Sequence, residues 1–71
     1  MEATAEDVKA RWGKVLQHKR EANGETQLQL AIRLGRDPQT ISRLERGQGA
    51  LDTYLATAAA LGVELLGEAG E

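Results

Sequence analysis

The chain has 71 residues, of which 41% are hydrophobic, with no cysteine and a net charge of -2. A domain of this length buries only about 60% of the surface that its unfolded chain exposes, so its core has little spare stability. Without cysteine, neither disulfides nor thiolate metal ligands can supplement that core. We therefore expect one domain, residues 1–71, held together by helix packing and in part by contacts between subunits.

No targeting or membrane segment is expected at either end of the chain. The acidic N-terminus has no apolar run, and the uncharged stretch at residues 54–63 is too short to cross a bilayer. The sequence therefore predicts a cytoplasmic protein with no membrane partner. Residues 1–4 and 67–71 are expected to fray, because Glu, Ala and Gly dominate them.

Charge is distributed unevenly along the chain. Residues 1–8 and 63–71 carry six carboxylates and no Lys or Arg, whereas residues 9–62 carry all nine basic residues against five acidic ones, a net charge of +4. A local excess of positive charge favours a polyanionic partner. The middle of the chain is therefore the part suited to phosphates.

Start and stop signals predict four helices in chain order. Residues 5–22 lie between an N-cap threonine and an Asn-Gly stop, and residues 27–34 between a Thr-x-x-Gln capping box and a glycine. Residues 38–46 follow an N-cap aspartate and begin with proline, which suits the first helical position. Residues 51–61 form a fourth helix that ends at glycine.

The apolar faces of these helices define an expected core. Its members are Val8, Trp12, Val15, Leu16, Leu30, Ala31, Leu34, Ile41, Leu44, Leu51, Tyr54, Leu55, Ala58 and Leu61. Gly13 lies inside the first helix, where glycine costs about 1 kcal/mol against alanine. Another backbone is therefore expected to approach it closely.

The segment that follows the fourth helix is too short for a stable helix. Val63, Leu65 and Leu66 are expected in a strand, which has no partner inside a helical monomer and would pair with its copy in a second chain. The sequence thus predicts an all-α fold, a compact bundle of four to five helices, with a two-stranded ribbon across a homodimer.

A set of spaced residues runs through all four predicted helices. It consists of Gly13, Leu16, Arg20, Thr26, Gln27, Leu30, Ala31, Leu34, Gly35, Thr40, Ile41, Ser42, Arg43, Glu45, Gly47, Leu51, Ala58, Leu61, Gly62 and Val63. With this set, residues 8–63 closely resemble the helix-turn-helix domain of the lambda repressor and Cro family. The resemblance implies a helix-turn-helix at residues 26–46 and binding to double-stranded DNA, with the helix of residues 38–46 in the major groove.

The recognition helix that this resemblance implies carries four candidate base contacts. Gln39 and Arg43 lie one turn apart on one face, and their side chains suit adenine and guanine respectively. Thr40 and Ser42 are further candidates, for a thymine methyl group or a phosphate oxygen. The alternative is a solvated polar helix face.

Gln27 matches the family's phosphate contact, at a helix N-terminus where free amides and the helix dipole favour an anion. Arg46, Arg36 and Gln48 are further candidates for phosphate contacts. Arg20 and Glu45 match positions at which many family members join the first helix to the recognition helix through an ion pair. The alternative for that pair is an exposed contact of little energetic weight.

Several residues depart from the family pattern, and three of them bear on binding. Pro38 stands where the family often has a polar base reader, so one usual readout position has no donor or acceptor. Leu28 and Ile32 are apolar where the family is usually polar, and they share one helix face. Packing against the first helix near Val15 is the favoured interpretation, and an exposed partner surface is the alternative.

The favoured function is transcriptional regulation, with repression favoured over activation. The protein would bind a two-fold related operator as a homodimer. A second hypothesis is an antitoxin that neutralises a toxin protein and autoregulates its operon, using Leu28, Ile32 and the acidic tail. A third is a scaffold with no role on DNA. An enzyme is not expected, and no metal or cofactor is predicted, because the chain has one histidine, no cysteine and only scattered carboxylates.

Overall fold

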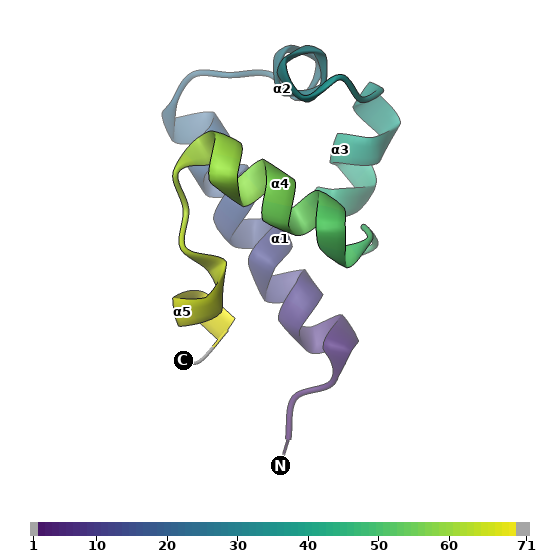
Figure 1. The fold of residues 1–71 in the computed structure, drawn as a ribbon, viewed down its shortest axis with the longest axis vertical. Coiled ribbons are helices and arrows are strands. Elements are labelled where there is room, and N and C mark those ends of the chain that lie inside the picture. The colour runs from purple at the N-terminus through teal and green to yellow at the C-terminus, as the bar shows by residue number, and fades with distance from the viewer. Residues whose placement is uncertain (1, 70–71) are drawn as a thin grey trace.

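Five helices form the domain in the computed structural model, which describes residues 2–69 (Figure 1). They are α1 (Ala5–Ala22), α2 (Gln27–Leu34), α3 (Pro38–Glu45), α4 (Leu51–Leu61) and α5 (Leu65–Ala69). No strand occurs among residues 2–69, so the predicted all-α fold is confirmed. None of the described helices has the length and hydrophobicity that crossing a membrane requires.

Local capping explains where the helices begin. Thr4 and Asp7 form a reciprocal capping box at α1, with two N–H···O bonds of 3.1 Å. Thr26 and Gln29 do the same at α2, and the carboxylate of Asp37 accepts the Thr40 amide at 2.9 Å to start α3. Each of these caps satisfies amides that have no partner inside the helix, so the sequence predicts these boundaries well.

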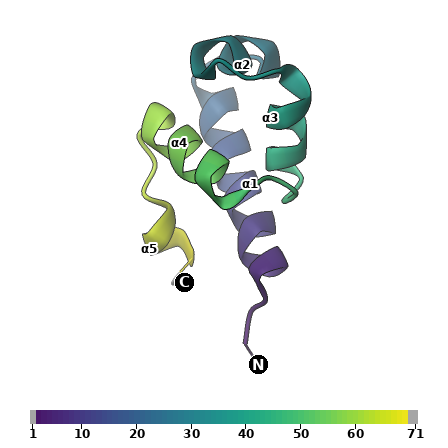
Figure 2. The same cartoon turned by 45° about the vertical axis from the view of Figure 1, so that its right-hand side comes forward.

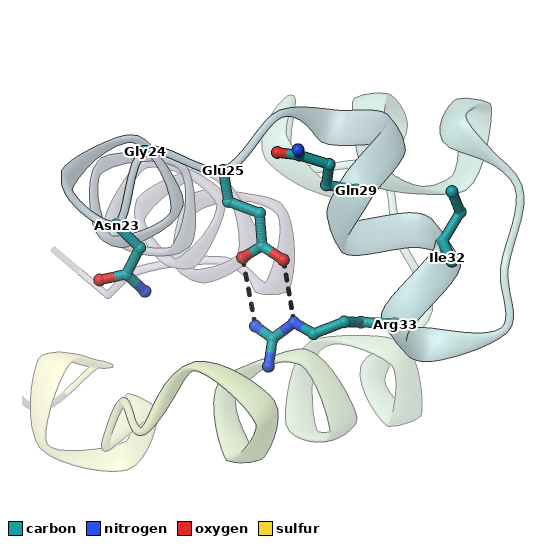
Figure 3. Close-up of a pocket in the computed structure, with 6 residues that line it drawn as sticks. All are labelled: Asn23, Gly24, Glu25, Gln29, Ile32 and Arg33. Carbon is teal, nitrogen blue, oxygen red and sulfur yellow. Dashed lines mark hydrogen bonds and ion pairs between the residues drawn. The ribbon is translucent and has the colours of Figure 1, made fainter.

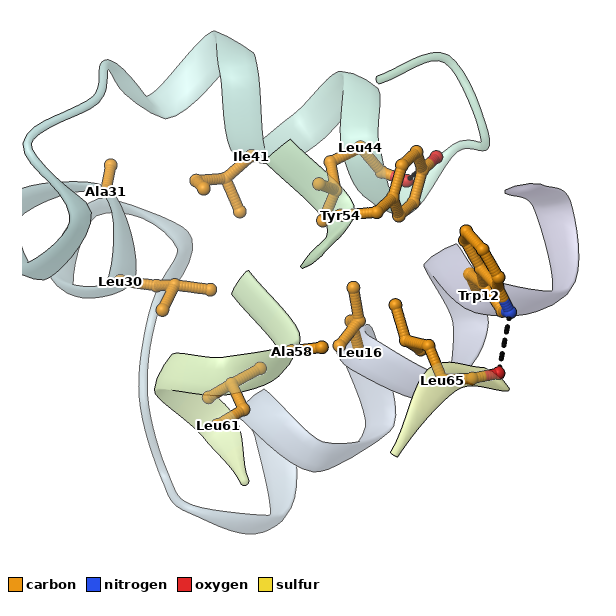
Figure 4. Close-up of a cluster of buried hydrophobic side chains, with 10 residues drawn as sticks. All are labelled: Trp12, Leu16, Leu30, Ala31, Ile41, Leu44, Tyr54, Ala58, Leu61 and Leu65. Carbon is orange, nitrogen blue, oxygen red and sulfur yellow. Dashed lines mark hydrogen bonds between the residues drawn. The ribbon is translucent and has the colours of Figure 1, made fainter. Parts of the chain in front are cut away.

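The long helix α1 is the element on which the others pack. Figure 2 shows α2 at the C-terminal end of α1, α3 at its side, α4 crossing it, and α5 returning toward it. One cluster of buried side chains joins all five helices (Figure 4). Its members are Trp12, Leu16, Leu30, Ala31, Ile41, Leu44, Tyr54, Ala58, Leu61 and Leu65. Val8, Val15 and Leu34 are only partly buried against it.

The buried face of α4 agrees only in part with the predicted one: Tyr54, Ala58 and Leu61 are buried as expected. Leu51 and Leu55, both expected in the core, are 53% and 46% exposed, whereas Thr53 and Thr57 are buried. The Thr57 hydroxyl donates to the Thr53 carbonyl oxygen at 2.7 Å, so its burial leaves no polar group unsatisfied. The predicted burial of Leu51 and Leu55 is therefore wrong.

The C-terminal segment is a helix, and the predicted strand at Val63, Leu65 and Leu66 is wrong. Gly62 adopts a left-handed conformation with φ 71°, and the Val63 amide donates to the Ala58 carbonyl oxygen at 2.9 Å, which turns the chain back toward α1. Leu65 is buried there, and its carbonyl oxygen accepts a 3.0 Å bond from the indole Nε1 of Trp12 (Figure 4).

These contacts hold Leu65 within its own monomer, so the intersubunit ribbon has no strand to form it. Val63 is partly buried, and Leu66 is exposed. Residues 67–69 are helical rather than frayed. At the other end, residues 2–4 lie outside the helices, with Thr4 ordered by its cap. The fraying expected at Met1 and at residues 70–71 concerns positions outside the described residues.

Gly13 allows α3 to approach α1 closely, as the sequence predicts. A Cβ atom at this position would lie 2.6 Å from the Glu45 carbonyl oxygen and 2.7 Å from that of Leu44. Both atoms belong to the backbone at the C-terminal end of α3, which cannot move aside as a flexible side chain would. The crossing of α1 and α3 therefore depends on the absence of a side chain here.

Replacing Gly13 with Ala should destabilise the domain by about 1–3 kcal/mol, even though alanine favours helix, because the added methyl group must displace α3. Urea unfolding measures the change. Gly67→Ala is the matched control, since its added Cβ would meet nothing closer than the Glu64 Cγ atom at 3.8 Å. If Gly13→Ala proves as stable as the control, the close approach is not a constraint.

Candidate nucleic-acid interface

A tight turn sets the angle between α2 and α3. Gly35 ends α2 in the left-handed conformation with φ 67°, and the Arg36 amide donates to the Ala31 carbonyl oxygen at 2.9 Å. Asp37 then caps α3, and Pro38 occupies its first position, where a missing N–H is harmless. The conformation of residues 35–37, which join the two short helices, is therefore determined by residues within the turn and at the start of α3.

The outward face of α3 presents two long polar side chains. Ile41, Leu44 and Glu45 face inward, and Gln39 and Arg43 are exposed on the other side. No hydrogen bond or ion pair links either of these two side chains to another residue in the range 2–69. Their donors and acceptors therefore remain available to a ligand.

Thr40 and Ser42, also predicted as base contacts, have local partners. The Thr40 hydroxyl lies 3.3 Å from the Asp37 carboxylate, and the Ser42 hydroxyl accepts a 2.6 Å bond from Nη1 of Arg46. Both residues are partly buried. The serine oxygen therefore orients the Arg46 guanidinium, whose other nitrogen donors remain free to contact an anion.

Two hollows lie near α2. The larger, of about 380 Å³, is lined by residues in the range 23–33, and the smaller, of about 290 Å³, lies between α2 and α3. The smaller hollow is lined by Gln27, Pro38, Gln39, Ser42 and Arg46. It brings together residues predicted for phosphate contact and residues predicted for base contact. Arg36 and Gln48 are exposed but do not line it.

Arg20 and Glu45 form an ion pair between α1 and α3. Nε and Nη2 of Arg20 donate to the two carboxylate oxygens at 2.6 and 3.1 Å, and the side chains are only 9% and 3% exposed. The bonds to Glu45 raise the pKa of Arg20. Nη1 of Arg20 also donates to the Glu25 carbonyl oxygen at 2.6 Å, so the guanidinium holds the α1–α2 turn as well.

Glu45 also fixes Gln27, a contact that the sequence does not reveal. Nε2 of Gln27 donates to Oε1 of Glu45 at 2.9 Å. An amide NH₂ group carries two protons, so this bond leaves one donor free at the N-terminus of α2. Residues 18 positions apart on different helices give no periodic signal, and only the folded crossing brings them together.

A second ion pair, also missed from the sequence, closes the turn between α1 and α2. Arg33 donates to both carboxylate oxygens of Glu25 at 2.9 and 3.2 Å (Figure 3). Its Nη1 also reaches the Ala60 carbonyl oxygen at 3.4 Å. The pair borders the larger hollow. Because α2 begins between the two residues, no single helix face links them.

Leu28 and Ile32 face solvent, with 54% and 69% of their surface exposed. Packing against α1 near Val15, the favoured interpretation, is therefore wrong. The inner face of α2 is occupied by Leu30, Ala31 and the partly buried Leu34, which leaves Leu28 and Ile32 on the outside of a two-turn helix.

Arg20→Met should cost about 3–5 kcal/mol of folding free energy, because it leaves the buried Glu45 carboxylate without its partner. Urea unfolding gives the value. Arg33→Met is the control, and its loss should stay below about 1 kcal/mol, since that arginine is 47% exposed. The double variant Arg20→Met with Glu45→Leu should recover much of the loss. Equal small losses at both arginines would show that burial adds nothing to the Arg20 pair.

The chain was compared with protein-family models and with curated proteins. No family model matches it, and no curated protein does.

Proposed function

We propose that the chain is a sequence-specific double-stranded DNA-binding protein that acts as a transcriptional repressor. In this proposal α3 enters the major groove, and two copies bind a two-fold related operator. The observation that carries the proposal is the exposed α2–α3 face, where Gln39 and Arg43 have no partner within residues 2–69. Gln39 also lines a hollow together with Gln27, Ser42 and Arg46. The resemblance to the lambda repressor and Cro family supports it.

The charge of this face suits a polyanion. Arg36, Arg43 and Arg46 are exposed around α3, whereas the Glu45 carboxylate is buried and neutralised by Arg20. Asp37 is the one exposed carboxylate between Thr26 and Gln48, and it is engaged in capping α3. Phosphates therefore meet a local excess of positive charge on a chain that is acidic overall.

Each side chain has a role that follows from its position. Gln39 and Arg43 match the donor and acceptor patterns of adenine and guanine in the major groove. Gln27 offers its free amide proton to a phosphate beside the unpaired amides that begin α2. Arg46, held by Ser42, adds a second phosphate contact. Pro38 contributes an apolar wall to the hollow and no polar contact.

Two copies are needed because α3 is short. With eight residues it presents few base-reading side chains, so one copy recognises only a short half-site. A two-fold dimer places two such helices in successive major grooves about 34 Å apart. The operator is then expected to be an inverted repeat.

Arg43→Ala should relax sequence preference, costing about 1–3 kcal/mol of discrimination at one base pair of each half-site. Selection of bound sequences from a random DNA pool at fixed salt measures this. Arg33→Ala removes the same charge from a residue paired with Glu25, away from the α2–α3 hollow, and should leave the selected sequence unchanged. An unaltered selection with Arg43→Ala would remove Arg43 from the readout.

Gln27→Ala should weaken binding to every sequence by a similar factor, because a phosphate contact positions the protein without discriminating bases. Titrations of one operator and one unrelated duplex of equal length at the same salt concentration give the two ratios. A loss confined to the operator would contradict the phosphate role. Thermal unfolding of the variant separates this effect from the loss of the bond to Glu45.

One observation favours a second function, that of an antitoxin. The exposed Leu28 and Ile32 form an apolar pair on the outer face of α2, which a toxin protein would cover. The test is whether this chain relieves growth arrest caused by the product of the adjacent gene. Under this hypothesis the double variant Leu28→Ser with Ile32→Ser loses relief and keeps DNA binding, and an adjacent gene with no toxicity excludes it.

A further inference from the structure

The N-terminal halves of α1 and α4 form an apolar surface that the proposed DNA contacts do not use. A hollow of about 380 Å³ lies there, lined by Ala5, Val8, Lys9, Trp12 and Leu51. Leu51 projects at its rim with 53% of its surface exposed, and Leu55 follows one turn later on the same face of α4. An apolar ridge therefore stands directly beside an apolar hollow.

This surface differs from the other exposed apolar pair, Leu28 and Ile32. The hollow beside Ile32 is bordered by the Glu25–Arg33 ion pair and by the polar side chains of Asn23 and Gln29. Water solvates such a hollow well. Apart from Lys9, the residues around Leu51 are apolar, so covering them removes hydrocarbon surface from water with little loss of polar hydration.

We propose that two copies of this chain meet at the Leu51 hollow, each inserting its Leu51 into the hollow of the other. A two-fold contact requires that one surface carry both the projecting and the receiving element, since residue i must meet residue j in both directions. The ridge of Leu51 and Leu55 and the hollow between Val8 and Trp12 meet that requirement on one face. This interface takes the place of the C-terminal ribbon and rests on the homodimer of the proposed function.

The charges at the rim fit a second copy. Lys9 lines the hollow, and Asp52 is exposed next to the projecting Leu51. Neither forms an ion pair with another residue in the described part of the chain. When Leu51 enters the hollow of the partner subunit, its neighbour Asp52 comes beside the Lys9 that lines that hollow. The two-fold axis repeats this contact, which gives two ion pairs at the edge of an apolar centre.

The position of this surface also suits the proposed function. Residues 46–50 lead from the end of α3 directly to Leu51, so the contact lies close to the C-terminal end of α3. A dimer formed here holds the two copies of α3 at one separation, which is what a two-fold operator of fixed spacing requires. The α2–α3 hollow stays open, because it shares no residue with the Leu51 hollow.

Sedimentation equilibrium without DNA tests the interface. We expect the native chain to dimerise and Leu51→Ser to weaken dimerisation by about tenfold or more, as for a residue at the centre of an interface. Leu28→Ser is the matched control, because Leu28 is 54% exposed and also lies at the start of a helix, and it should leave the dimer unchanged. A native chain that stays monomeric, or equal effects of the two variants, would overturn the proposal.

Exchanging the two charges tests the proposed ion pairs, because a purely hydrophobic contact would not respond to the exchange in this way. Lys9→Glu and Asp52→Lys should each weaken the dimer, since each places like charges together, and the double variant should restore it. Failure of the double variant to recover would reject the predicted pairing.

DNA binding by the Leu51→Ser variant, measured on a duplex with a single half-site, separates the dimer interface from the proposed DNA function. Half-site binding without dimers supports the Leu51 interface and the DNA function together, whereas dimers without any DNA binding reject the function alone.

Discussion

The buried ion pair between Arg20 and Glu45 is the interaction on which the rest of the structure depends. It joins the longest helix to α3. Because both side chains are buried, removing either one would leave the other charge unpaired and poorly solvated, which is costly. Gly13 makes the pair possible, since a side chain there would push the end of α3 away from α1. The tilt of α3, and so the direction in which Gln39 and Arg43 point, follows from one crossing of two helices.

The same carboxylate links folding to the proposed DNA contacts. Glu45 accepts bonds from Arg20 and Gln27, so it holds the start of α2 and the body of α3 in one arrangement. An unpaired carboxylate so near the proposed phosphate site would repel DNA, and Arg20 neutralises it without using a surface arginine. Stability and ligand geometry therefore depend on one buried group.

Sequence alone predicts the helix boundaries because the signals are local: Thr4, Thr26 and Asp37 cap, and Gly35 and Gly62 stop. It predicts the burial of Tyr54, Ala58 and Leu61 but not that of Thr53 and Thr57, because apolar periodicity gives no sign that a threonine hydroxyl will bond inside its own helix. The helix at Leu65 likewise depends on a Trp12 bond from 53 residues away. At the candidate site, the resemblance identifies the candidate contact residues. It does not identify the hydrogen-bond partners of Gln27 and Ser42, which only the folded structure shows.

Trp12 connects the C-terminal helix α5 to the Leu51 hollow. Its indole nitrogen holds α5, its ring lies 5.9 Å from that of Tyr54, and its edge lines the Leu51 hollow. The docking of the C-terminal helix thus sets one wall of a surface built from α1 and α4. As the sole tryptophan of the chain, it is also an intrinsic fluorophore, whose emission reports the docking of α5 and the covering of that surface at once.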